Sequence, residues 1–167
     1  NAAPGPIAED RLYYTGDGAP KMRVGGTVYP LALTAPTATP VATVSGTGSG
    51  DTVSRTYAWT WVTSFGEESA PSPASVIVDW KPGQTVTISG FSATPSGRSI
   101  TKQRIYRSQT GTSGTYLYLI AERSASAGNY VDNVAVDAFQ EVLPSSGWTP
   151  PPAGLSGLIS MPNGMMA

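Results

Sequence analysis

Residues 56–72 read TYAWTWVTSFGEESAPS, and this stretch decides the fold class of the chain. Its first half carries four aromatic side chains within nine residues, and Tyr57, Trp59 and Trp61 stand at alternate positions. Aromatic residues with a period of two are typical of a β-strand. The second half turns at Gly66 and then meets prolines, which interrupt strands. The segment therefore predicts a strand and a turn of an all-β protein, and it contains no catalytic motif.

Further strand candidates share this composition, because each is rich in Val, Ile, Thr, Tyr or Trp and is bounded by Gly, Pro, Ser or Asn. They are residues 11–15, 21–24, 27–33 (interrupted by Pro30), 41–45, 55–64, 75–80, 85–90, 100–108, 116–122 and 129–131. Gly25-Gly26 is a two-residue hairpin signal. Strands at such spacing, with turn signals between them, predict a β-sandwich or a β-barrel.

Two segments have less regular patterns. Residues 116–121 (YLYLIA) are apolar on both predicted faces, so this strand is central or covered on its outer face. Residues 135–142 are expected to form a short helix or irregular structure.

In the strand at 75–80, Val76, Val78 and Trp80 are predicted to share one face.

The chain divides into three parts along the sequence. Residues 1–40 form an N-terminal arm with short strands and a proline-rich linker, residues 41–143 the sandwich, and residues 144–167 a proline-rich exit with an apolar tail. The chain begins at Asn1 rather than at methionine, and we expect it to be part of a longer polypeptide.

Composition excludes several classes of function. The 167 residues contain no cysteine and no histidine, so disulfides, cysteine-ligated zinc and a Ser–His triad are impossible. Ten basic and eleven acidic residues form no basic patch, so nucleic acid is not expected as a partner. No apolar run approaches the length of a membrane span. Charged residues are only 13% of the chain, which suits either a surface covered by neighbours or a threonine-rich β-protein surface.

Polar clusters give no catalytic, cofactor or metal site. Glu67 and Glu68 are adjacent in a turn and are expected to be solvated and divergent. Asp132, Asn133 and Asp137 could supply calcium oxygens, but their spacing does not form a calcium loop. The GTGSG stretch at 46–50 lacks the lysine and the helix of a phosphate-binding loop.

The aromatic residues of the strand at 55–64 leave two interpretations. Tyr57, Trp59 and Trp61 lie on one face of the strand. If that face points inward it is core, and if it points outward it is a stripe on which sugars could stack. We expect core.

A family resemblance rests on several of these stretches. The run from Tyr57 to Ser72, the RIYRS stretch at 104–108, the strand at 116–121 and Tyr130-Val131-Asp132 resemble the strands, Gly-Glu-Ser turn and Tyr-x-Asp corner of fibronectin type III modules. The resemblance covers residues 53–143. It implies an immunoglobulin/fibronectin type III-like antiparallel β-sandwich with extended N- and C-terminal arms. In that family the aromatic strand and turn come near the end of the module, so here the strand order is permuted or residues 41–45 and the N-terminal strands complete the sandwich.

A narrower resemblance combines four stretches. RLYYTGDGAPKM at 11–22, SFGEESAPSP at 64–73, QRIYRS at 103–108 and GWTPPPAGLSGLISMPNG at 147–164 are together similar to a class of tailed-bacteriophage virion proteins. This resemblance implies a non-enzymatic structural component of a bacteriophage tail, neck or tail-attached appendage. Its location would be the virion, an extracellular particle, and its partners copies of itself, in a symmetric homo-oligomer, and other virion proteins.

The residues expected to contact partners are apolar or aromatic and lie in the two arms. They are Tyr13, Tyr14, Trp148, Leu155, Leu158, Ile159, Met161, Met165 and Met166. The alternative function is an accessory β-sandwich module of a secreted bacterial enzyme or adhesin, including one that binds carbohydrate.

Overall fold

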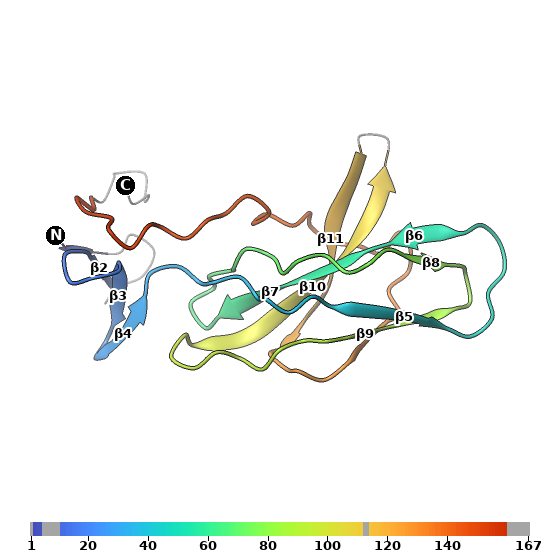
Figure 1. Cartoon of the computed structure of the whole chain (residues 1–167), viewed down its shortest axis with the longest axis horizontal. Helices are drawn as coiled ribbons and strands as arrows, with labels where there is room; N and C mark the ends of the chain where they lie inside the picture. Colours follow the sequence, from blue (N-terminus) through green and yellow to red (C-terminus); the bar gives the residue numbers. More distant parts are fainter. Residues whose placement is uncertain (1, 5–10, 112–113, 160–167) are drawn as a thin grey trace. The chain divides into compact units, whose positions relative to one another are not determined.

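The computed structural model describes residues 2–4, 11–111 and 114–159, and its elements are all β-strands (Figure 1). The predicted all-β class is confirmed. In the described part of the chain, no helix is long and apolar enough to cross a membrane. The chain forms two compact units, of which one is Thr34–Trp148 and the other combines the N-terminal strands with the chain after Trp148. The sequence predicts boundaries after residues 40 and 143.

The unit Thr34–Trp148 contains two antiparallel three-stranded sheets and a two-strand extension, arranged as a β-sandwich (Figure 1). One sheet has the order β11-β10-β7, with β7 at Tyr57–Thr63, β10 at Ile100–Gly111 and β11 at Gly114–Ser124. The other has the order β12-β9-β5, with β5 at Val41–Ser45, β9 at Thr85–Ser89 and β12 at Tyr130–Asp132. The extension pairs β6 (Val53–Arg55) with β8 (Val78–Trp80).

Aromatic side chains of β7 fill the space between the sheets. Tyr57, Trp59 and Trp61 are buried, and Trp59 meets Trp61 and Phe91 edge to face at 4.5 and 5.3 Å between ring centroids. Ile88 contributes a fully buried side chain from the other sheet. The core interpretation of the aromatic face is confirmed, and the outward stripe is excluded.

The chain that follows the Gly66 turn runs back along β7 in an unusual register. Serines at every third position (69, 72 and 75) pair with every second residue of β7 (61, 59 and 57). Each serine N–H donates to a β7 carbonyl at 2.8–3.0 Å, and each serine Oγ accepts the N–H of the same β7 residue at 3.0–3.1 Å. We call Ser69, Ser72 and Ser75 the serine ladder. The serine N–H groups supply the donors that Pro71 and Pro73 lack, since proline has no N–H, and the serine hydroxyls supply acceptors for the β7 N–H groups.

The serine ladder changes two sequence-based expectations. The predicted strand at 75–80 begins only at Val78, and Val76 is 82% exposed, so its predicted face shared with Val78 and Trp80 is wrong. The predicted strand at 55–64 is divided at Thr56, whose hydroxyl donates to the carbonyl of Ser75 at 2.8 Å.

Residues 135–143 form irregular structure rather than a helix. A turn at Ala135–Ala138 is followed by a segment that borders β11, where Gln140 and Leu143 N–H groups donate to the carbonyls of Leu119 and Leu117. Leu143 covers the buried pair Tyr106 and Leu119. This cover explains why β11 is apolar on both faces. Beyond Arg107, the β10–β11 hairpin extends past the end of β7 (Figure 1).

The second unit contains a small antiparallel sheet of order β1-β2-β3-β4. Its strands are β1 (Ala2–Pro4), β2 (Arg11–Tyr14), β3 (Lys21–Val24) and β4 (Thr27–Pro30). The hairpin predicted at Gly25-Gly26 is confirmed, because Val24 pairs with Thr27. The strand predicted at 27–33 ends at Pro30.

Candidate functional site

The residues expected to contact partners differ in exposure. Tyr13 and Leu158 are buried within the chain itself, whereas Trp148 and Ile159 are exposed. Tyr14 and Leu155 are half-buried. Met161, Met165 and Met166 lie outside the described residues.

The small sheet has two faces of different character. Its registers align Tyr13 with Met22 and Tyr29 in one row, in which Tyr13 and Met22 are buried. They align Leu12 with Arg23 and Val28 in the next row, which is exposed. Leu12 is 36% and Val28 47% exposed. We call Leu12, Arg23 and Val28 the exposed row.

Leu12 and Val28 are not among the residues predicted from the sequence to contact partners. Tyr13 and Tyr14 are, because of their aromatic character, although adjacent strand residues point to opposite faces. The period of two in residues 11–14, combined with the Gly25-Gly26 hairpin, could have placed Leu12 and Val28 together across β3, because the hairpin fixes the register of β3 and β4.

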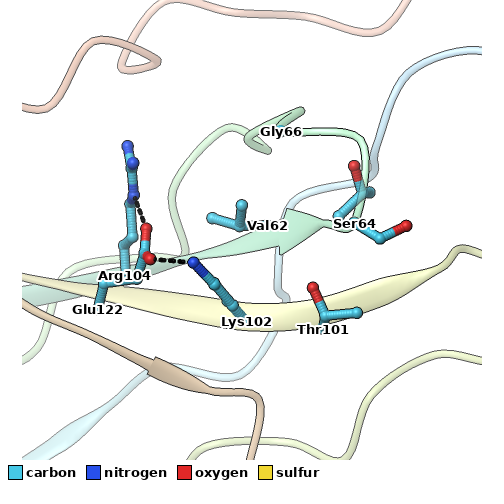
Figure 2. A pocket seen from close by; sticks show the side chains of 8 residues that line it. Val62, Ser64, Gly66, Thr101, Lys102, Arg104 and Glu122 are labelled. Carbon is cyan, nitrogen blue, oxygen red and sulfur yellow. Dashed lines mark hydrogen bonds and ion pairs between the residues drawn. The ribbon is translucent and has the colours of Figure 1, made fainter.

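The outer face of sheet β11-β10-β7 carries a cluster of charges around Arg104. Arg104 donates to Glu68 at 2.8 Å, to Glu122 at 2.9 Å and to Glu141 at 3.1 Å. Lys102 donates to the other oxygen of Glu122. Figure 2 shows the Glu122 carboxylate between the two cations. These two cations hold the pKa of Glu122 below its usual range, Lys102 having the larger effect.

Glu68 is not the solvated turn acid that the sequence suggested. Its side chain is only 6% exposed, and its carboxylate accepts hydrogen bonds from Thr60 Oγ1, Tyr106 Oη and Arg104. The Glu67 carboxylate accepts a hydrogen bond from Thr63 Oγ1 instead, so the two carboxylates diverge as expected. Burial, reinforced by the bond to Glu68, raises the pKa of Tyr106 above the ordinary tyrosine range.

A hollow of about 460 Å³ lies beside this charge cluster (Figure 2). It is lined by Val62, Thr63, Ser64, Gly66, Thr101, Lys102, Arg104 and Glu122. The lining cations are both paired with Glu122, and the hydroxyl of Ser64 is bonded to that of Ser99 at 2.8 Å. The hollow is therefore a neutralised polar surface. Among the described residues, no group of three or more Asp or Glu side chains is placed to hold a metal ion.

Asp132 belongs to a buried cluster that joins the two sheets. Arg107 on β10 donates to both carboxylate oxygens of Asp132 on β12 at 3.0 Å, and Tyr57 Oη donates to one of them at 2.9 Å. Arg55 lies 3.5 Å from the same carboxylate and stacks on Trp80. The calcium alternative for Asp132 is therefore wrong, because its oxygens are bonded to cations. Burial raises the pKa of Tyr57 above the ordinary range and lowers that of Arg55.

A second hollow, of about 350 Å³, lies at the base of the β10–β11 hairpin. Its lining is uncharged and consists of Thr56, Ser108, Thr115, Tyr116, Leu117, Val142, Leu143 and Ser146. It offers packing surface and hydroxyl groups but no acid or base.

Comparison of the chain with family models, curated proteins and solved structures gives no match. The resemblances to fibronectin type III modules and to tailed-bacteriophage virion proteins therefore stay predictions. The residues and their geometry carry the functional argument.

Proposed function

We propose that this chain is a non-enzymatic structural component of a tailed-bacteriophage virion, in the tail, neck or a tail-attached appendage. It acts by packing against copies of itself and against other virion proteins in the extracellular particle. The observation that carries the proposal is the exposed row of the small sheet, where Leu12 and Val28 flank Arg23 in water. The four stretches that resemble virion proteins support the same conclusion.

The small sheet has little core of its own. Its strands contain three or four residues each, and β2, β3 and β4 bury two large apolar side chains, Tyr13 and Met22, whereas the independent stability of a small sheet requires a hydrophobic face or packing against another element. Covering an exposed Leu or Val side chain stabilises an assembly by about 1–2 kcal/mol at most, from roughly 25 cal/mol per Å² of apolar surface. A neighbouring subunit on the exposed row supplies that cover.

The sandwich suits the role of a rigid spacer. Its two sheets are joined by the Asp132 cluster and by the aromatic core, and the serine ladder covers the outer edge of β7. A rigid fibronectin type III-like module is consistent with these features. The buried Trp59 and Trp61 remove the platform on which the carbohydrate-binding alternative depended.

Analytical ultracentrifugation of the full chain over a wide concentration range tests the proposal. We expect an oligomer, and we expect the double variant Leu12→Ser/Val28→Ser to weaken its self-association. The matched control is Val76→Ser, which removes an 82% exposed apolar side chain from the other unit and leaves association unchanged.

Assembled particles provide the second readout. Trypsin sites at Lys21 and Arg23 should be protected in particles and accessible in the free chain. A chain that is monomeric at every concentration, with these sites still cleaved in particles, contradicts the proposal.

A further inference from the structure

The outer face of sheet β12-β9-β5 is defined by its alternation and register. Along β9, Val86 and Ile88 are buried, so Thr85, Thr87 and Ser89 point outward. The registers place Val41, Thr43 and Ser45 of β5 and Val131 of β12 beside them on the same face. We call these seven residues the hydroxyl face: Val41, Thr43, Ser45, Thr85, Thr87, Ser89 and Val131.

The hydroxyl face contains only valine, threonine and serine, although it lies on the outside of the sandwich. Val41 is 55% and Val131 48% exposed. The outer face of the opposite sheet carries Lys102, Arg104 and Glu122. Sheet faces and edges exposed to water commonly carry charges that prevent association, and the hydroxyl face has none.

We infer that the hydroxyl face is a homotypic interface, on which the same face of a second copy packs. An uncharged face disfavours a charged partner, because burying an unpaired charge is costly. The partner face must therefore be uncharged as well. The hydroxyl face of a second copy is uncharged and meets this condition. With a twofold axis parallel to β9 between the two faces, β5 of one copy lies over β12 of the other.

Hydroxyl groups also make the face complementary to itself, because each can donate and accept a hydrogen bond. The structure contains such pairs between like residues. Thr110 and Thr115 Oγ1 atoms are 2.8 Å apart, as are the Oγ atoms of Ser64 and Ser99. Across a twofold interface the central Thr87 meets its own counterpart or a near neighbour, while Val41 and Val131 supply apolar area at the two edges.

A charge-swap experiment tests this interface apart from the exposed row. Thr87→Lys and Thr87→Glu are each introduced into the full chain that already carries Leu12→Ser/Val28→Ser. We expect this double-variant parent to dimerise in sedimentation equilibrium. Each charged variant should raise the dimer Kd at least about tenfold, since like charges then face each other. An equimolar mixture of the two should restore dimers, because opposite charges then meet.

The control is Thr115→Lys, which places the same charge on an exposed strand threonine outside the face. If Thr87→Lys is misfolded by circular dichroism, Thr43→Lys replaces it on the same row. A monomeric parent, or charged variants that dimerise as the parent does, overturns the inference and leaves the exposed-row proposal standing. Dissociation by Thr87→Lys without any effect of Leu12→Ser/Val28→Ser supports the inference and overturns the proposed role of the exposed row.

Discussion

Asp132 joins the two sheets through buried side-chain bonds, beside the aromatic core. Its carboxylate is bonded to Arg107 and Tyr57 and lies near Arg55, all of them buried. Its bonding partners lie 25 and 75 residues away in sequence, so no local pattern could predict them. For the same reason the burial of Glu68 by Arg104 and Tyr106 could not be predicted from the sequence.

Replacing Asp132 by Asn should be strongly destabilising. The change leaves two buried guanidinium groups without a counter-charge, and breaking a buried ion pair costs about 3–5 kcal/mol. Urea unfolding at neutral pH measures the loss. Asp79→Asn is the control, because Asp79 is exposed and bonded only to Ser54 among the hydrogen bonds found for its side chain, so its effect should be within about 0.5 kcal/mol. Equal effects of the two variants would contradict the structural role of Asp132.

Tyr57 should give the protein an alkaline limit of stability. Its pKa is raised in the folded state by burial and by the charge of Asp132, so the unfolded chain releases this proton first as pH rises. The contribution of Tyr57 to stability is therefore fully present below about pH 10 and is lost as the pH rises above it. Tyr57→Phe should be less stable at neutral pH, because it loses the bond to Asp132, and should lose less stability between neutral and alkaline pH. The free energy of unfolding of both proteins is measured with urea at neutral and alkaline pH. An equal decrease with pH in the two proteins would contradict this assignment.

At the scale of elements, periodicity predicted most strands and the Gly25-Gly26 hairpin correctly. Residues 21–24 and 41–45 were placed with their observed ends. The predictions failed where side-chain hydroxyls replace backbone partners, at Thr56 and at residues 75–77. A period of three in serine gives no signal on scales of hydrophobicity, although serine is known to compete for backbone hydrogen bonds.

The serine ladder predicts a measurable cost for a single hydroxyl. Ser72→Ala leaves the buried N–H of Trp59 without its acceptor, which costs about 1–3 kcal/mol. Ser96→Ala, in an exposed turn, is the matched control and should change stability by less than about 0.5 kcal/mol. Hydrogen exchange of the Trp59 amide provides a local readout and should accelerate in Ser72→Ala. Unchanged exchange and stability would show that the hydroxyl is dispensable.

At the scale of the whole molecule, the sandwich followed from strand spacing together with the family resemblance, but the grouping of the chain did not. The two ends belong to one compact unit, and Thr34–Trp148 forms the other. A linear division of the sequence could not reveal this, because the segments that meet are more than a hundred residues apart. The hydroxyl face was also invisible until the registers of β5, β9 and β12 fixed which residues share it.

The two units should differ in resistance to proteolysis in the free chain. The small sheet buries few apolar side chains, and regions of this kind open locally at low cost in free energy. Trypsin should therefore cleave at Arg11, Lys21 or Arg23 before it cleaves at Arg98, which lies in the loop between β9 and β10. Mass spectrometry of timed digests identifies the order. First cleavage at Arg98 would contradict the stability difference.

The three-against-two register of the serine ladder also constrains which changes of length this chain can survive. Substitutions at the intervening positions 70 and 74 leave every hydroxyl in place, whereas deletion of Ala70 would move Pro73 into the position of Ser72. Proline offers neither the hydroxyl nor the N–H that Trp59 requires. Along this edge the chain therefore tolerates substitutions between the serines, but it does not tolerate a deletion, which shifts the spacing of the hydroxyls.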